Sequence, residues 1–176
     1  MYFLNWQRHI DMKESRKVYW PVVFFVLVTS TAAKSQTVTV YDSFPQLESR
    51  FHASGDTTLL VNFWATWCKP CIEEMPYFQS LEKKFAGKKF KILLVSLDFR
   101  MQLETQVIPF VKNKKIKPEV VLLADADANN WISHVDSQWD GAIPVTLLVV
   151  HGEKFFYGQR FDSQKQLESW IAAHVN

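Results

Sequence analysis

The sequence predicts an α/β fold in which helices flank a central mixed β-sheet. Apolar, β-branched runs typical of buried strands alternate along the chain with segments of helical periodicity. The last two predicted strands are joined by the two-residue turn His151-Gly152, so they form a hairpin that makes one edge of the sheet antiparallel. With 176 residues and 48% hydrophobic content, the chain can build one domain with a single core.

The order of elements follows from the apolar patterning and from the turn residues between the apolar runs. The predicted strands are residues 37–41, 57–65, 89–98, 119–125, 142–150 and 153–158. The predicted helices are residues 43–53, 69–86, 101–115, 128–135 and 164–174. Ser43 and Ser163 are expected to be N-caps, and Gly87 is expected to be the C-cap of the second helix.

Residues 1–35 have the parts of an export signal. Arg16 and Lys17 precede an apolar run of 11 residues, 18–28, which is short for a membrane span of about 20 residues. Small residues follow this run at Thr31, Ala32, Ala33 and Ser35. Two alternatives stay open for this segment, a signal peptide that is cleaved and an N-terminal anchor that is not.

Cleavage after Ser35 would leave Gln36 as the first residue of a mature domain, 36–176, with Ala33 and Ser35 at the −3 and −1 positions. A more compact signal begins at Met12, so the true start is expected there. Export would place the domain outside the cytoplasm, in the periplasm, either secreted or held at the inner membrane. Cysteines tend to be oxidised in that environment.

Charge is unevenly placed along the chain. Five of the 20 Lys and Arg but only two of the 18 Asp and Glu lie in residues 1–35, so the predicted domain is close to neutral. A neutral domain gives no electrostatic case for binding nucleic acid. Contact with a membrane is expected only through the N-terminal segment.

Cys68 and Cys71 are the only cysteines, and three roles can be weighed for them. A structural disulfide closing so small a loop would stabilise the fold very little in the chain-entropy account. A structural zinc ion requires four protein ligands. The chain has only two cysteines and its histidines are scattered singly, so no metal site is predicted. A redox pair explains the placement best, because the pair lies where a predicted buried strand meets a helix.

At the start of a helix, unpaired N–H groups and the positive end of the dipole favour a thiolate over a thiol. Cys68 is therefore expected to be the exposed nucleophile, and Cys71, one turn further in, is expected to resolve the mixed disulfide. Pro70 fits the first turn because its missing N–H costs nothing there. A charged Lys69 would favour the Cys68 thiolate further.

Two other prolines bear on the same site. Ile143-Pro144 begins a predicted strand, so Pro144 either holds a cis bond that presents unpaired backbone to a substrate peptide or is an ordinary trans proline. Pro76 lies inside the second predicted helix and is expected to kink it.

The segment NFWATWCKPCIEEMP resembles the active-site segment of the thioredoxin superfamily, specifically of its TlpA-like and ResA-like branch of exported thiol–disulfide oxidoreductases. AIPVTLL resembles the cis-proline strand of that family, and the likeness covers about residues 37–175. The resemblance implies a thioredoxin-like fold with an N-terminal strand and helix extension and a central insert. It also implies that Cys68 is the nucleophile, Cys71 the resolving thiol and Pro144 the cis-proline.

The same likeness draws attention to two polar residues. Asn62 stands where ordinary thioredoxins carry a buried aspartate, and an amide cannot shuttle a proton. Glu74 stands three residues after Cys71, where the TlpA-like branch keeps a functional glutamate that would exchange a proton with the resolving thiol. The alternative is that Glu74 is a surface helix residue, like Glu73 beside it.

Three tryptophans lie near the predicted site. Trp67 is expected to flank the site and shield one side of the sulfur, the alternative being simple packing. Trp64 is assigned to the core, and Trp139 either borders a peptide groove or belongs to the core.

The resemblance implies an extracytoplasmic enzyme that reduces disulfides in exported proteins, such as apocytochrome c before haem attachment. Electrons would come from a membrane donor of the thiol-relay type, and neither a metal nor an organic cofactor is expected. One rival is a thiol peroxidase of the peroxiredoxin type, which needs a threonine and an arginine around a single peroxidatic cysteine. The other rival is a peptide-binding module whose cysteines are incidental. The sequence does not set the direction of electron flow, because the reduction potential depends on the surroundings of the thiolate.

Overall fold

The computed structural model describes residues 37–52 and 54–175. The predicted signal or anchor in residues 1–35 and the predicted start at Met12 lie outside the described residues. Among the described residues, no helix combines the length and the apolar character that crossing a membrane requires.

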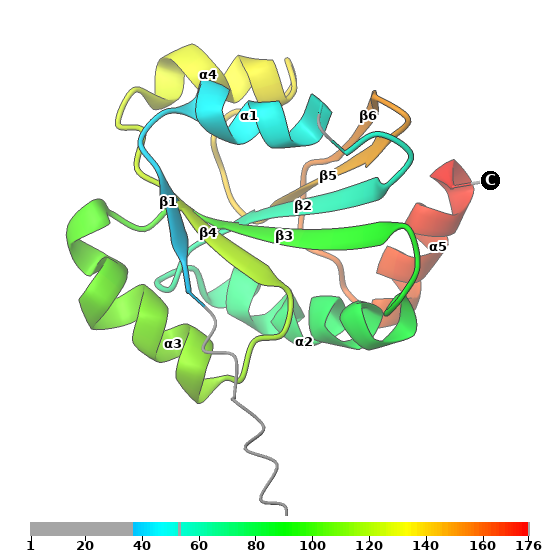
Figure 1. Ribbon diagram of the computed structural model, residues 1–176, viewed down its shortest axis with the longest axis horizontal. Coiled ribbons are helices and arrows are strands. Elements are labelled where there is room, and N and C mark those ends of the chain that lie inside the picture. The colour runs from blue at the N-terminus through cyan, green and yellow to red at the C-terminus, as the bar shows by residue number, and fades with distance from the viewer. Residues whose placement is uncertain (1–36, 53, 176) are drawn as a thin grey trace, which may run out of the picture. The chain divides into compact units, whose positions relative to one another are not determined.

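Six strands form one mixed sheet in the order β1-β4-β3-β2-β5-β6 (Figure 1). They are β1 (Thr39–Tyr41), β2 (Thr58–Trp64), β3 (Phe90–Ser96), β4 (Glu119–Leu123), β5 (Val145–Val150) and β6 (Glu153–Tyr157). The first four of these in the sheet order are parallel, whereas β5 is antiparallel to β2 and β6 is antiparallel to β5. The prediction of a mixed sheet with an antiparallel edge is confirmed.

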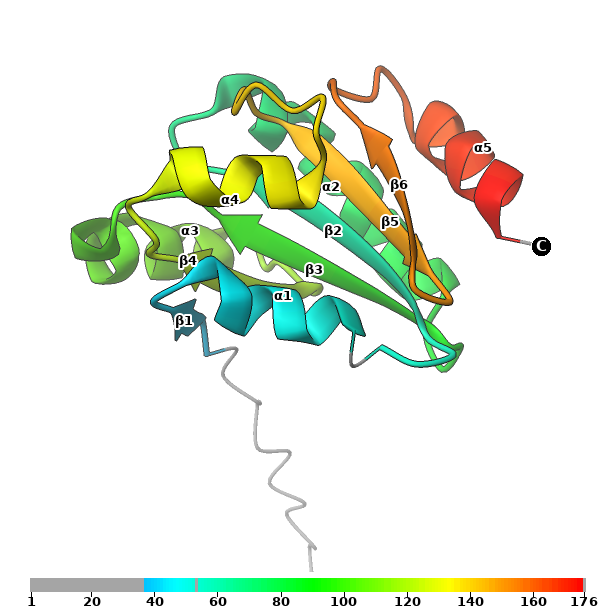
Figure 2. The same cartoon turned by 90° about the horizontal axis from the view of Figure 1, so that it is seen from above.

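Helices cover both faces of the sheet. They are α1 (Phe44–His52), α2 (Lys69–Lys84), α3 (Ile108–Asn113), α4 (Ala128–Val135) and α5 (Gln164–His174). Figures 1 and 2 show α1 and α4 on one face and α2 and α3 on the other, with α5 beside β6. Two apolar cores follow from this layering, because buried residues of α1 and α4 form one cluster and those of α2, α3 and α5 form the other.

β2 is the centre of the sheet, and all seven of its residues are buried. Its side chains alternate between the two cores, as the period of a strand requires. Leu60 and Trp64 join the core under α2, whereas Val61 and Phe63 join the core under α1 and α4. Asn62 therefore faces α2 from between two apolar residues, where a polar group needs partners of its own.

The predicted helix over residues 101–115 is wrong in its details. The chain is helical from Arg100, but it runs through a 3₁₀ turn (Arg100–Gln102) and a π-helical turn (Leu103–Val107) before it becomes α3. Pro109, at the start of α3, has no N–H to donate to the turn before it, which favours such irregular hydrogen bonding. Apolar periodicity alone does not distinguish these kinds of helix.

The expected C-cap at Gly87 is also wrong. Helix α2 ends at Lys84, and its C-cap is Phe85, whose N–H donates to the carbonyl of Leu81 at 2.9 Å. Gly87 lies two residues later at a φ of 75° and makes the turn into β3. By contrast Ser163 caps α5 as predicted, since its hydroxyl accepts the Gln166 N–H at 3.2 Å.

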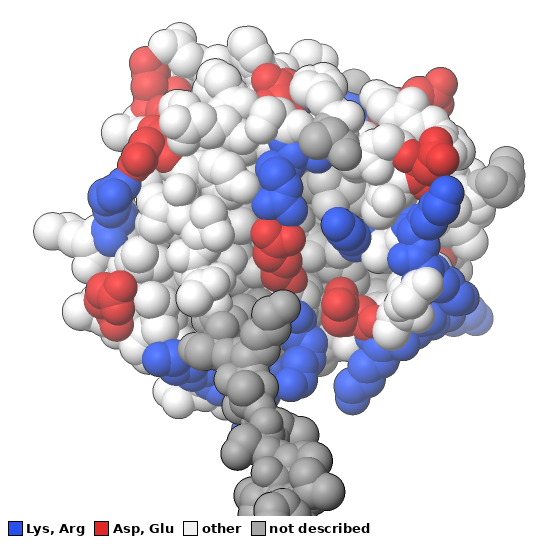
Figure 3. All heavy atoms as spheres, viewed as in Figure 1, with Lys and Arg blue, Asp and Glu red and all other residues white. Residues whose placement is uncertain are grey.

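The surface seen in Figure 3 carries acidic and basic side chains interspersed over most of that face, with basic side chains more crowded toward the lower right. Charges of both signs interspersed in this way create no strong field of one sign.

The central strand provides a direct test of the packing. Phe63 is fully buried against Trp131 and Trp139, at ring-centroid distances of 6.4 Å and 5.0 Å. Phe63→Ala should lower the free energy of unfolding by about 3–5 kcal/mol, because it removes a large buried ring and leaves a cavity. The matched control is Phe99→Ala, at a phenylalanine that is 72% exposed, which should cost less than about 0.5 kcal/mol. Urea denaturation measures both, and equal losses would contradict the assigned core.

Candidate active site

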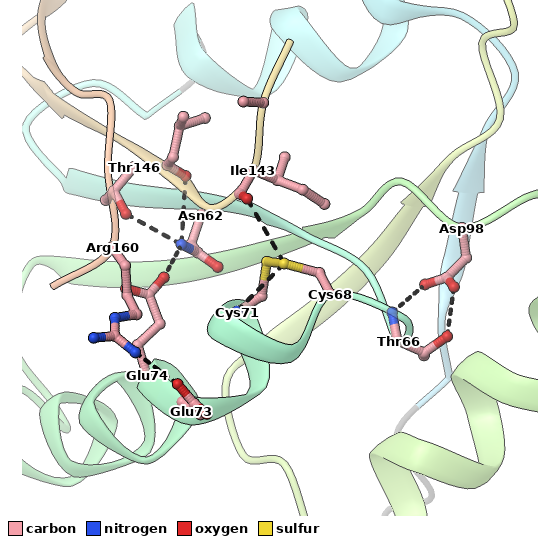
Figure 4. The surroundings of a disulfide bond; sticks show 12 residues. Asn62, Thr66, Cys68, Cys71, Glu73, Glu74, Asp98, Ile143, Thr146 and Arg160 are labelled. Carbon is pink, nitrogen blue, oxygen red and sulfur yellow. Dashed lines mark hydrogen bonds and ion pairs between the residues drawn. A yellow bond between two sulfur atoms is a disulfide. The ribbon is translucent and has the colours of Figure 1, made fainter. Parts of the chain in front are cut away.

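Cys68 and Cys71 lie at the junction of β2 and α2 and are joined by a disulfide bond (Figure 4). Cys68 is the N-cap of α2, and Lys69 and Pro70 are its first two helical residues. Pro70 therefore occupies the first turn, as predicted, where an N–H would have no helical partner.

Burial differs between the two sulfurs, but less than the sequence suggests. Cys68 is only 5% exposed and Cys71 is fully buried. The expectation that Cys68 is openly exposed is therefore wrong, although it is the one cysteine of the pair that reaches the surface. Helix α2 turns Cys71 inward onto the same face as Met75 and Phe78, which both belong to the core under α2.

The start of α2 favours negative charge on Cys68. Its sulfur accepts the N–H of Cys71 at 3.3 Å, and the N–H of Ile72 donates to the Cys68 carbonyl at 3.1 Å. When the disulfide is reduced, the same amide and the positive end of the helix dipole would stabilise a Cys68 thiolate. Lys69 is exposed, and its effect on the thiolate stays a prediction.

The loop before β5 lies directly beside Cys68. The Ile143–Pro144 peptide bond is cis, as one of the two sequence alternatives predicts, and the Ile143 carbonyl oxygen lies 3.8 Å from the Cys68 sulfur. The predicted strand over residues 142–150 begins only at Val145, because the cis-proline loop stands apart from the ladder that β5 forms with β2. Within the described residues, the Ile143 N–H donates no hydrogen bond.

Glu74 is buried, so the alternative of a surface helix residue is wrong. It is 1% exposed and lies one helical turn after Cys71. One carboxylate oxygen accepts the side-chain amide of Asn62 at 3.0 Å, and the other accepts the backbone N–H of Phe161 at 2.9 Å. Glu73, by contrast, is exposed and forms an ion pair with Arg160 at 2.6 Å.

Burial raises the pKa of Glu74 from 4.5 to about 7. The hydrogen bonds from Phe161 and Asn62 and the positive charge of Arg160 act in the opposite direction and limit the rise in this pKa. A carboxyl group with a pKa near neutrality can both accept and release a proton under ordinary conditions, as a general acid or base must.

A second buried carboxylate holds the turn that carries Cys68, and sequence reasoning missed it. Asp98 follows β3 and is 2% exposed. It accepts the backbone N–H of Thr66 at 3.0 Å, the Thr66 hydroxyl at 2.5 Å and the Ser96 hydroxyl at 2.7 Å. The only sequence pattern that could have indicated Asp98 is an aspartate at the end of a predicted buried strand.

The tryptophans divide between surface and core. Trp67 is 60% exposed beside the disulfide, which leaves it free to contact a substrate. Trp64 is fully buried, as predicted. Trp139 is 6% exposed and donates its indole N–H to the Ala142 carbonyl at 2.7 Å, so it belongs to the core. Trp139 and Phe99 both line a surface cavity of about 290 Å³.

Pro76 lies inside α2, which the structure describes as one continuous helix, and a kink there stays a prediction. Among residues 37–52 and 54–175, no three His, Cys, Asp or Glu residues come together in a way that could hold a metal ion.

The strand–helix junction, the cysteine pair and the cis-proline loop together define a protein of the thioredoxin superfamily. Solved structures agree with this fold. StoA from Bacillus subtilis aligns over 66% of this chain and 84% of its own, with a TM-score of 0.52 and 24% identity. A putative thiol:disulfide interchange protein DsbE from Chlorobium tepidum aligns over 71% of this chain and 84% of its own, with a TM-score of 0.57 and 20% identity.

A family model described as the AhpC/TSA family matches residues 31–154. The chain belongs to the AhpC/TSA family, and its relatives are of the ResA-like kind within the thioredoxin superfamily.

Two curated relatives illustrate that kind. The thiol-disulfide oxidoreductase ResA of Oceanobacillus iheyensis is 33% identical over 88 residues, which are 50% of this chain and 42% of ResA. The thioredoxin-like protein YneN of Bacillus subtilis is 44% identical over 52 residues, which are 30% of each chain. The chain thus matches less than half the length of these relatives.

The raised pKa of Glu74 predicts how stability changes with pH. The folded state holds the proton of Glu74 more tightly than the unfolded state, so this carboxyl stabilises the fold fully below about pH 4.5, and that contribution is lost as the pH rises to about 7. Glutamine does not titrate, so Glu74→Gln should lack this loss. The unfolding free energy of Glu74→Gln minus that of wild type should therefore rise by about 3 kcal/mol between about pH 4 and pH 8.

Denaturant titrations at several pH values measure this difference in the oxidised proteins. Glu73→Gln is the matched control, because it removes an exposed carboxylate from the same helical turn. Parallel pH curves for wild type and Glu74→Gln, or an equal gain in Glu73→Gln, would contradict the assignment.

Asp98 predicts a large structural cost. Asp98→Ala removes the acceptor of the Thr66 N–H and of the Ser96 hydroxyl and leaves the Thr66 hydroxyl with Gln106 Oε1 alone, so it should lower the unfolding free energy by about 3 kcal/mol. The control is Asp56→Ala, whose carboxylate is 79% exposed in an ion pair with Lys89 and should cost less than about 1 kcal/mol. A loss in Asp98→Ala no greater than that of the control would show that this carboxylate does not hold the turn.

Proposed function

We propose that the protein is a thiol–disulfide oxidoreductase that uses the Cys68–Cys71 pair. One observation carries this proposal: a disulfide at the start of α2 is followed, one helical turn later, by a buried carboxyl group whose pKa is raised to about 7. The names of the sequence relatives support the same activity.

In the reducing direction, the reaction has two exchange steps. The Cys68 thiolate attacks one sulfur of a substrate disulfide, forms a mixed disulfide and releases the other substrate sulfur as a thiolate, which takes up a proton. The Cys71 thiol then gives its proton to Glu74, and its thiolate attacks Cys68. This forms the Cys68–Cys71 disulfide and releases the second substrate thiolate, so that two electrons pass to the substrate.

Substrate would lie against the cis-proline loop and Trp67. The unpaired N–H of Ile143 can donate to an extended peptide, as an exposed strand edge does. The Ile143 carbonyl lies beside the Cys68 sulfur, so a peptide bound there would bring its own sulfur into reach. Trp67, directly before Cys68 in the chain and 60% exposed, offers a substrate an apolar contact.

The finer proposal is an extracytoplasmic reductase of exported proteins, with a role of the cytochrome c maturation type. It rests on the export-like segment in residues 1–35 and on the resemblance to the ResA-like branch. A membrane thiol-relay protein would then supply electrons to the oxidised pair. No metal or organic cofactor enters the chemistry, because thiolate exchange is complete with two cysteines and one proton carrier.

Two rival functions predict different results. A thiol peroxidase would need an arginine at the cysteine, whereas each arginine in the described part of the chain pairs with carboxylates, namely Arg50 with Glu119, Arg100 with Asp42, and Arg160 with Glu73 and Asp162. Rapid peroxide consumption that depends on Cys68 would favour the peroxidase. A peptide-binding module would keep its function in Cys68→Ser.

Trapping tests the proposed roles of the two cysteines. Reduced Cys71→Ser should form a stable mixed disulfide with a small disulfide-bonded protein through Cys68, because nothing remains to resolve it. Cys68→Ser is the matched control and should trap far less, since Cys71 is fully buried. Mass spectrometry of the intact proteins measures the adduct, and equal trapping by the two variants would contradict these roles.

A further inference from the structure

The side-chain oxygen of Asn62 is a buried acceptor without a partner. It is one of three buried side-chain polar atoms in the described residues that form no hydrogen bond. An unpaired acceptor in an apolar core is costly, and native proteins rarely leave one without a reason.

The orientation of this amide follows from its neighbours. The nitrogen of Asn62 lies 3.0 Å from Glu74 Oε1, 3.1 Å from Thr146 Oγ1 and 3.4 Å from the Val145 carbonyl. A carboxylate and a carbonyl accept hydrogen bonds, so the end of the amide that faces them must be the NH₂ group. The oxygen therefore points the other way, toward the side on which Cys71 lies (Figure 4).

The sheet and the helix place Asn62 and Cys71 in the same layer. Asn62 lies between Leu60 and Trp64 on β2, and both of these belong to the core cluster that contains Cys71. Glu74, which follows Cys71 by one helical turn, is already bonded to Asn62. The amide thus lies between the buried carboxyl group and the buried sulfur.

Reduction of the disulfide creates a donor at this place. Cys71 is fully buried, so the S–H group that forms on it can donate only to an acceptor within the protein. The Cys71 N–H already donates to Cys68 Sγ and the Ile72 N–H to the Cys68 carbonyl, so neither of these amides competes with the thiol for the Asn62 oxygen. The Asn62 side-chain oxygen is thus an acceptor without a donor, and the Cys71 S–H group is a donor without an acceptor.

We infer that Asn62 is a positioning residue whose side-chain oxygen accepts a hydrogen bond from the Cys71 thiol in the reduced protein and is left vacant in the oxidised protein. This inference rests on the proposed function and names a residue that acts through Cys71. Because the bond exists in the reduced state alone, it stabilises that state and makes the disulfide easier to reduce. It also holds the resolving thiol beside Glu74.

The charged groups around this cluster come from two segments. Glu74 and Glu73 lie on α2, and Arg160 and Asp162 lie in the loop between β6 and α5. Glu74 is itself an acceptor and competes for the Cys71 thiol, so an experiment must separate the two.

Infrared spectroscopy of the S–H stretch separates them, because Cys68→Ser leaves Cys71 as the one thiol in the chain. In that protein the stretch should lie at the lower frequency of a hydrogen-bonded thiol. Adding Asn62→Leu should move it to the frequency of a free thiol, whereas adding Glu74→Gln should leave it in place. An unchanged band in the Asn62→Leu protein, or a shift caused by Glu74→Gln instead, would overturn the inference.

A redox titration of the chain with both cysteines gives the second readout. Asn62→Leu should lower the equilibrium constant for reduction by dithiothreitol by about two- to tenfold, the range expected for one neutral hydrogen bond. Asn62→Asp keeps an acceptor and should retain the low S–H frequency. Thr146→Val is the matched control, because it disturbs the same amide but leaves its oxygen in place, and it should change neither readout.

Asn62→Ala, with a smaller side chain, serves if the leucine variant does not fold. Neither readout uses substrate turnover. Wild-type protein that fails to reduce protein disulfides would therefore refute the proposed function and leave the Asn62 bond intact, whereas an unmoved S–H band would refute the bond alone.

Discussion

The pairing of β2 with β5 is the constraint on which the rest of the site depends. Asn62 on β2 lies directly opposite Thr146 on β5, and the antiparallel register continues to Phe63 and Val145. Cys68 follows the C-terminal end of β2, and Ile143 precedes the N-terminal end of β5. Because these two strands are antiparallel, both residues lie at the same end of the strands. The 3.8 Å approach of the Cys68 sulfur to the Ile143 carbonyl is a consequence of this register.

The same pairing builds a polar pocket inside an apolar core. Asn62 and Glu74 are buried among residues that offer little solvation, and burying such groups costs free energy unless they bond to one another. Their shared hydrogen bond and the Phe161 N–H offset much of that cost, yet the pKa of Glu74 stays raised to about 7. The raised pKa means that the buried carboxyl group lowers the stability of the fold at neutral pH, a balance that is common at functional sites.

Local patterns in the sequence predicted the elements and the reactive groups. Alternating apolar runs placed the strands, and CxxC at a strand–helix boundary identified the pair. A proline at a strand entry marked the cis-proline loop as one of two alternatives. Each of these patterns involves residues that are close together in the chain, so it can be recognised in a single sequence.

Contacts between distant residues could not be predicted in this way. Asp98 is 32 residues from Thr66, and Glu74 is 87 residues from Phe161, so no local pattern links these partners. The irregular helix before α3 was missed because apolar spacing is similar in α-, 3₁₀- and π-helical turns over so few residues. The exposure of Cys68 was overestimated because Ile143, 75 residues away, covers its sulfur.

The reduction potential of the Cys68–Cys71 pair tests the central claim most directly. The chain from Gln36 would be equilibrated with glutathione and dithiothreitol, and tryptophan fluorescence would report the oxidised fraction. A working reductase predicts a potential near that of thioredoxin, about −270 mV. A value near about −120 mV would keep the redox pair but contradict the reducing direction. A value below about −300 mV, typical of structural disulfides, would contradict the redox role of the pair and leave it as a structural disulfide.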